Sequence, residues 1–90
     1  MNITDTLNDR EKKYGKFADN AHLAQSFRNT MRTANGWYSL PDTQCEALDS
    51  IMGKIARQIN GAKDYPDNFH DIAGYAMLAE QEILSQLREK

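Results

Sequence analysis

Four acidic residues have the spacing of a metal site on two helices. Glu46 and Asp49 are three positions apart, and Asp67 and Asp71 are four apart, so each pair lies on one side of a helix. Carboxylate oxygens from two facing helices could bind Mg²⁺, which keeps several of its waters. Such an ion would serve the phosphates of a nucleotide.

The same acids also have an interpretation that involves no metal. Asp67 stands at a predicted helix start, where its charge favours the positive end of the helix dipole. Glu46 and Asp49 would then be solvated or paired with nearby basic side chains. The sequence leaves both interpretations open.

Two glycines lie beside these acids. Gly53 and Gly74 stand inside the last two predicted helices, where each costs about 1 kcal/mol relative to alanine. At about 100° per residue, each is turned away from the main apolar stripe of its helix. Either another backbone packs closely there, or the bare patch admits a ligand. Both interpretations require the last two helices to be covered on two flanks.

A contact surface is predicted on this second side of the long helices and at the aromatic pair that follows a turn. Trp and Tyr are enriched at protein interfaces. The interface candidates are Trp37, Tyr38, Gly53, Arg57, Gly74, Tyr75 and Leu78. A further group near Gly15, formed by Tyr14, Lys16, Phe17 and Arg28, either faces a ligand or anchors one helix on the next.

The chain shows no complete catalytic group. Cys45 is the single cysteine, which excludes an internal disulfide and suits a reducing compartment. His22 and His70 lack the spacing of a zinc motif. These features favour a binding role over a catalytic one and predict no bound cofactor. Mg²⁺ is expected only in the alternative in which the four acids form a metal site.

The elements that must position these residues are all helical. The chain has no valine and no alternating strand pattern, and helical segments are predicted at about 4–14, 17–34, 40–60 and 65–88. Ser39 and Asp64 are the expected N-caps of the last two. The prediction is one all-α domain, residues 1–90: a small bundle of about four helices with two long antiparallel C-terminal helices.

The predicted core stripes are thin. Leu, Ile, Val and Phe total only 16 of 90 residues, and a core this small supplies only a few kcal/mol. We therefore expect a second copy or a partner to complete the core, which makes the protein a homo-oligomer. The stripes are Phe17, Ala24, Phe27 and Met31; Leu48, Ile51, Met52, Ile55 and Ile59; and Phe69, Ile72, Ala73, Ala76, Ile83 and Leu87.

Charge and hydropathy exclude several classes of partner. The net charge is −2, without the basic excess of a nucleic-acid-binding domain. No stretch approaches the roughly 20 apolar residues of a membrane span. The N-terminus lacks the cationic and then apolar order of a signal peptide. A cytoplasmic protein is expected.

Two segments carry a resemblance to a known family. "EALDSIMGKIARQINGAKDYPDNFHDIAGYAMLAEQ" (46–81) and "LNDREKKYGKFADNA" (7–21) resemble a small, uncharacterised family of tailed bacteriophages and prophages. Those proteins end in a lysine-bearing helix, a glycine-containing loop and a "DIAGYA" segment. The resemblance spans most of the chain and implies a phage-encoded protein in the host cytoplasm.

A more distant resemblance concerns nucleotides. "DIAGYAML" is similar to a helix of phage nucleotide-modification-associated proteins and to the acid-bearing helices of all-α nucleoside triphosphate pyrophosphohydrolases. In the latter, Glu-x-x-Glu and Glu-x-x-Asp helices ligate Mg²⁺. Glu46 and Asp49 would match the first helix and Asp71 the last acid of the second, but Asn68 stands where the other acid is needed.

Two functions from different classes follow. The first is a helical protein that acts by protein–protein contact on a host or phage component, with modulation or antagonism of a host defence system as one version. The alternative is a Mg²⁺-dependent nucleotide-binding or pyrophosphohydrolase-like protein using the four acids.

Overall fold

The computed structural model describes residues 2–89 and is all-helical over that range. Its elements are α1 (Ile3–Tyr14), α2 (Phe17–Met31), the short 3-10 helix η1 (Asn35–Ser39), α3 (Asp42–Asn60) and α4 (Asp67–Arg88). The described residues contain no strand, which confirms the predicted all-α bundle with two long antiparallel C-terminal helices. None of the described helices has the length and apolar character needed to cross a membrane.

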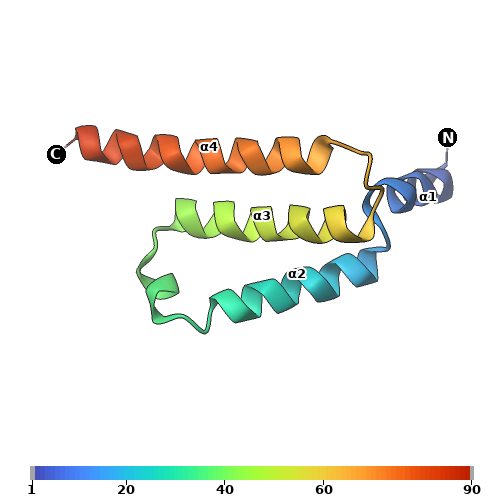
Figure 1. Ribbon diagram of the computed structural model, residues 1–90, viewed down its shortest axis with the longest axis horizontal. Coiled ribbons are helices and arrows are strands. Elements are labelled where there is room, and N and C mark those ends of the chain that lie inside the picture. The colour runs from blue at the N-terminus through green and yellow to red at the C-terminus, as the bar shows by residue number, and fades with distance from the viewer. Residues whose placement is uncertain (1, 90) are drawn as a thin grey trace.

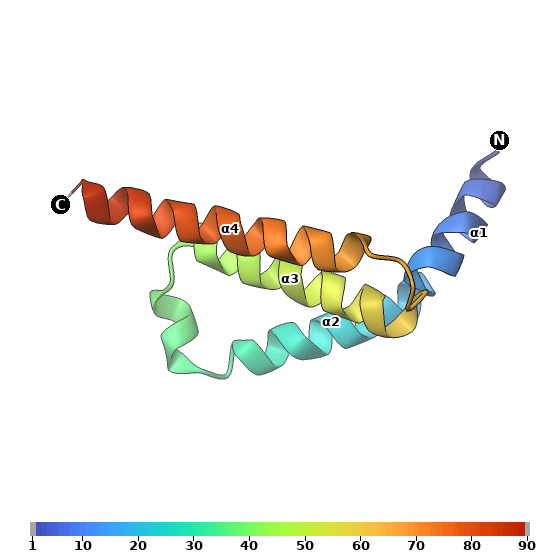
Figure 2. The ribbon, with the colours of Figure 1, turned by 45° about the horizontal axis from the view of Figure 1, so that its top comes forward.

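The three longest helices lie side by side in a single layer with α3 in the middle (Figure 1). α3 packs against α4 on one flank and α2 on the other, while α1 projects from one end (Figure 2). The overall extents are 51 × 27 × 23 Å. The prediction that both long helices are covered on two flanks therefore holds for α3, whereas α4 has a helix along one flank only.

The starts of α3 and α4 differ from the prediction. Each helix begins directly after a proline, Pro41 or Pro66, and neither has a side-chain cap. The predicted N-caps were wrong because Ser39 forms the end of η1 and Asp64 lies two residues before Pro66. The fixed φ of proline suits the entry into a helix, which reduces the need for a capping side chain.

α1 is joined to the layer where two chain segments cross at close range. Gly15 has a φ of 83°, and a Cβ there would lie 2.5 Å from the carbonyl oxygen of Asn60. A Cβ on Gly61 would collide with the carbonyl of Lys13, which accepts a hydrogen bond of 3.0 Å from the Ala62 N–H. Only glycine allows this backbone approach.

The fully buried core of one chain is very small. Its buried apolar residues are three alanines, Ala24, Ala47 and Ala56. The buried polar residue is Asn68, whose amide donates to Gln58 Oε1 at 3.3 Å while its own Oδ1 has no partner. The small alanine side chains let the three helices approach closely, but they bury little apolar area.

The contacts of α3 show which of its sides faces α4, which faces α2 and which points out of the layer. Lys54 and Gln58 meet α4, whereas Asp49 and Asn60 meet α2 on the other side. At about 100° per residue, these two directions are nearly opposite. The predicted stripe around Leu48 points between them, out of the layer.

By the same construction, the predicted stripes of α3 and α4 lie on one side of the layer together with Phe27 of α2, and we call this side the apolar face. No fourth helix covers it within the described residues, so its side chains are half-buried or exposed instead of forming a closed core. The α2 stripe was also wrong at Phe17, which is 87% exposed. The apolar face comprises Leu23 and Phe27 of α2; Leu48, Ile51, Met52, Ile55 and Ile59 of α3; and Phe69, Ile72, Ala76, Ile83 and Leu87 of α4.

Candidate binding face

The opposite side of the layer, which we call the polar face, is hollowed between the helices. One depression of about 210 Å³ spans all three helices and is lined by Arg28, Ser50, Gly53, Lys54, Arg57 and Tyr75. A second, of about 270 Å³, follows α4 past Gly74 and Leu78. The polar face thus gathers five of the seven predicted interface residues: Gly53, Arg57, Gly74, Tyr75 and Leu78.

Neither glycine of the polar face is covered by another backbone. Nothing lies within 4 Å of a Cβ built on Gly74, and a Cβ on Gly53 would meet only Arg28 Nη2, at 3.4 Å. The close-packing interpretation of these glycines is therefore wrong within one chain. The bare helix surface at Gly53 instead forms part of the floor of two hollows.

Asp49 is bound by Arg28, in the last turn of α2, and by Arg32, the residue that follows this helix. Arg32 donates to both of its carboxylate oxygens, at 3.1 and 2.8 Å. Arg28 donates to the Asp49 main-chain carbonyl at 3.0 Å, and its Nε lies 3.8 Å from the carboxylate without a hydrogen bond. This group ties the middle of α3 to the C-terminal half of α2.

Asp71 has a separate cationic partner. Lys54 Nζ lies 2.8 Å from Asp71 Oδ2. This hydrogen bond, together with the charge of Lys54, lowers the pKa of Asp71 below its ordinary value. Desolvation opposes the shift but is the smaller effect.

The four acids of the predicted metal site do not come together within one chain. Residues 2–89 contain no group of three His, Cys, Asp or Glu side chains that could hold a metal ion. Asp49 and Asp71 pair with cations on different helices, and Glu46 accepts a long hydrogen bond of 3.5 Å from Ser50. Within one chain, Asp49 and Asp71 are thus each part of an ion pair, and the metal site stays a prediction.

An apolar groove with an acidic rim lies between the start of α3 and the middle of α4. Its volume is about 520 Å³, and its floor includes Ala47, Tyr75 and Ala79. Leu78, at the edge, is 62% exposed. The other lining residues are Asp42, Thr43, Glu46 and Glu82, three of which are acidic.

The aromatic pair after α2 has a different environment. The Arg32 guanidinium lies 4.5 Å from the ring centroid of Trp37, and the Tyr38 hydroxyl donates to the Arg32 carbonyl at 3.1 Å. Both aromatics therefore fix η1 against the end of α2. Tyr38 remains 73% exposed, so contact with a partner stays a prediction for it.

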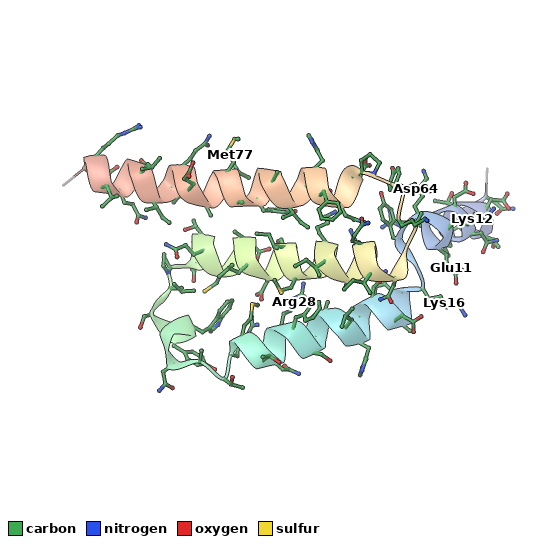
Figure 3. All side chains as sticks on the ribbon, in the orientation of Figure 1. Glu11, Lys12, Lys16, Arg28, Asp64 and Met77 are labelled. Carbon is green, nitrogen blue, oxygen red and sulfur yellow. The ribbon has the colours of Figure 1, made fainter. Side chains whose placement is uncertain are left out.

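Another opening, which we call the arginine cleft, lies where α1, α2 and α3 meet. Its volume is about 260 Å³, and its lining contains three arginines and no acid. Arg28, one of its lining residues, reaches from α2 toward α3 (Figure 3). The lining residues are Arg10, Tyr14, Phe17, Asn20, Ala21, Ala24, Gln25, Arg28, Gly53 and Arg57.

The sequence predicted only part of the arginine cleft. Tyr14, Lys16, Phe17 and Arg28 were grouped as residues that either face a ligand or anchor one helix on the next. The structure places Tyr14, Phe17 and Arg28 in the lining, whereas Lys16 is not among the lining residues. Arg10 was missed because its helix projects from the layer. Its position depends on the Gly15–Asn60 crossing, which no local pattern shows.

Comparison with known proteins places the chain in a family. Residues 3–83 match the family described as Domain of unknown function (DUF6378). The chain belongs to the DUF6378 family. The match includes α1, α2 and α3 and most of α4, so the DUF6378 domain contains both faces of the layer. No curated protein and no solved structure matches the chain.

Proposed function

We propose that this DUF6378 protein acts by protein–protein contact, and that its working form pairs two copies through their apolar faces. The observation that carries the proposal is the imbalance of burial in one chain. Three alanines are its only buried apolar residues within 2–89, whereas Ile59 of α3 and Phe69, Ile83 and Leu87 of α4, all on the apolar face, are exposed.

Pairing of two layers would complete the core. Each chain presents the apolar sides of three helices, and a second layer laid on them would bury Leu48 and Ile55 together with Phe69. Apolar burial stabilises by about 25 cal/mol per Å², so a face of this kind favours a stable dimer over a monomer. Two-fold pairing of one patch with itself is the commonest way in which soluble chains associate.

Pairing through the apolar face leaves the polar face outward for a different protein. The acidic-rimmed groove suits an apolar side chain flanked by lysine or arginine on the partner. Its floor offers Ala47 and Ala79, and the carboxylates of Asp42 and Glu82 stand around it. Complementary charge at such a rim increases the association rate and the selectivity for a basic partner.

The setting of this contact comes from the resemblance to proteins of tailed phages and prophages. We propose that the protein works in the cytoplasm of the host cell, where it binds a host or phage protein. Modulation of a host system, including antagonism of a defence system, is the form of contact that this setting favours.

Sedimentation velocity and partner capture test the two halves of the proposal. A dimer at micromolar concentration is expected, and a stable monomer would overturn the pairing. For the outward contact, partners retained by the wild-type chain should be lost from Leu78→Glu in the groove and kept by Met77→Glu, whose site points away from α3 (Figure 3). Equal retention by both variants would refute the groove as the contact site.

A further inference from the structure

We propose that the arginine cleft binds the phosphate group of a small ligand that also carries a flat ring. The proposal goes beyond protein contact and concerns a different part of the polar face. It remains compatible with pairing through the apolar face, because the cleft opens on the other side of the layer.

Charge is the first argument. The chain as a whole is slightly acidic, with 11 Lys and Arg against 13 Asp and Glu. The cleft nevertheless collects three arginines from three helices and no carboxylate. Within residues 2–89, no carboxylate lies in ion-pair contact with Arg10 or Arg57. Such a local excess of positive charge favours an anion.

Arg28 already donates to the Asp49 carbonyl at 3.0 Å, whereas Arg10 and Arg57 are held against an aromatic ring. The guanidinium groups of Arg10 and Arg57 lie 5.2 and 5.5 Å from the centroid of the Tyr14 ring. Packing on a ring uses the face of a guanidinium, whereas its five N–H groups point outward in the plane. Two oriented guanidiniums beside one opening match the paired acceptors of a phosphate.

Tyr14 is itself fixed in place. Its carbonyl accepts a hydrogen bond of 2.6 Å from the Asn20 amide, and Asn60 donates to Asn20 Oδ1 at 3.1 Å. The ring packs edge-on against Tyr65 with centroids 5.7 Å apart. Together with the Gly15 crossing, these contacts give the cleft a preformed wall, which reduces the cost of ordering on binding.

The position of Phe17 is the reason why we expect the ligand to carry a flat ring. It lines the cleft, yet 87% of its surface is exposed. An aromatic ring at the mouth of a cationic cleft provides a stacking surface for a base or similar ring. The volume of about 260 Å³ is close to the roughly 300 Å³ lower end of ligand sites, which suits a ligand the size of a nucleoside monophosphate or smaller.

Isothermal titration with inorganic phosphate, pyrophosphate and a panel of nucleoside monophosphates, at low salt and without added metal, tests the proposal. Saturable binding is expected, and Arg57→Gln should weaken it about 10-fold, the usual effect of losing a charge-assisted hydrogen bond. Arg88→Gln makes the same charge change at the far end of α4 and should leave affinity within about 2-fold, because a distant charge is screened by salt.

Phe17→Ser separates the two parts of the ligand. Because Phe17 is exposed, this variant should fold normally, keep its affinity for pyrophosphate and lose the preference for nucleotides. Absence of saturable binding by every phosphate probe would overturn the proposal. Equal loss of affinity in Arg57→Gln and Arg88→Gln would also overturn the proposal, because it would show that the probes are attracted by the overall charge and not by the cleft. In a parallel titration with added Mg²⁺, binding that requires the metal and is lost in Asp71→Ala would refute the cleft and point to the acids instead.

Discussion

The substitution Phe69→Glu offers the sharpest test of pairing through the apolar face. Phe69 lies in the first turn of α4, and its side chain is 63% exposed in the single chain. Glutamate near a helix N-terminus is favourable to the helix dipole, so the isolated chain should keep its fold. The substitution should therefore weaken mainly the association of a second copy with the apolar face.

The size of the effect follows from the exposed area. A phenylalanine buries about 200 Å² when fully covered, so 63% exposure leaves about 130 Å², worth about 3 kcal/mol at 25 cal/mol per Å². If pairing covers half of that area, each copy loses about 1.5 kcal/mol on substitution. With two copies in the dimer, the dissociation constant should rise at least ~100-fold.

Sedimentation velocity over a range of protein concentrations measures this constant, and circular dichroism checks that the helices persist. Met77→Glu is the matched control, because Met77 is 59% exposed on the same helix but points away from α3 (Figure 3). Its dimer constant should be unchanged. The reasoning is refuted if the two variants weaken association equally, or if the wild-type chain does not associate at all.

Three further predictions concern stability. Gly74→Ala should raise the free energy of unfolding by up to about 1 kcal/mol in a urea titration, because the site is helical and a Cβ there meets nothing within 4 Å; a loss would show that something covers the glycine. Gly15→Ala should lower it by about 1–3 kcal/mol, since its φ is 83° and Asn60 blocks the added carbon; an unchanged midpoint would contradict the crossing. The pKa of Asp71 is held low by Lys54, so the stability from this pair is complete above the ordinary carboxyl pKa and is lost as pH falls through the lowered value; a carboxyl titration by NMR should show the pKa returning upward in Lys54→Met, and no return would exclude the pair as its cause.

Much of the secondary structure could be predicted because it depends on local signals. The absence of valine, the two prolines and the glycines after helix ends are all visible in the sequence, and the four helices follow them closely. The predicted caps failed at Ser39 and Asp64 because proline itself occupies the residue before each helix. Helical periodicity also gave the apolar sides of α3 and α4, but the α2 stripe was wrong at Phe17.

The arrangement of those stripes could not be predicted from periodicity. An apolar stripe indicates that one side of a helix is buried. It does not indicate whether the same chain or another chain buries it. Here three helices lie in one layer, so the stripe around Leu48 and Phe69 faces outward instead of inward. The two-flank prediction failed at α4 for the same reason.

The candidate sites were likewise predictable only in part. Spacing correctly brought Gly53, Arg57 and Tyr75 to one face, because helical angle alone decides this. It left open whether the acids bind a metal or pair with cations, and it could not identify Arg32 as the partner of Asp49, because the two residues are 17 positions apart. Contacts between distant segments decided which acids were available.

The crossing at Gly15 has a consequence for motion. α1 has no buried residue and is tied to the layer near a single point, so its amide hydrogens should exchange with solvent faster than those of α3. Arg10 is carried by this loosely held helix, whereas Arg57 belongs to the middle of the layer. A ligand that bridges Arg10 and Arg57 would slow amide hydrogen exchange along α1. Exchange in this helix would then show whether the arginine cleft is occupied.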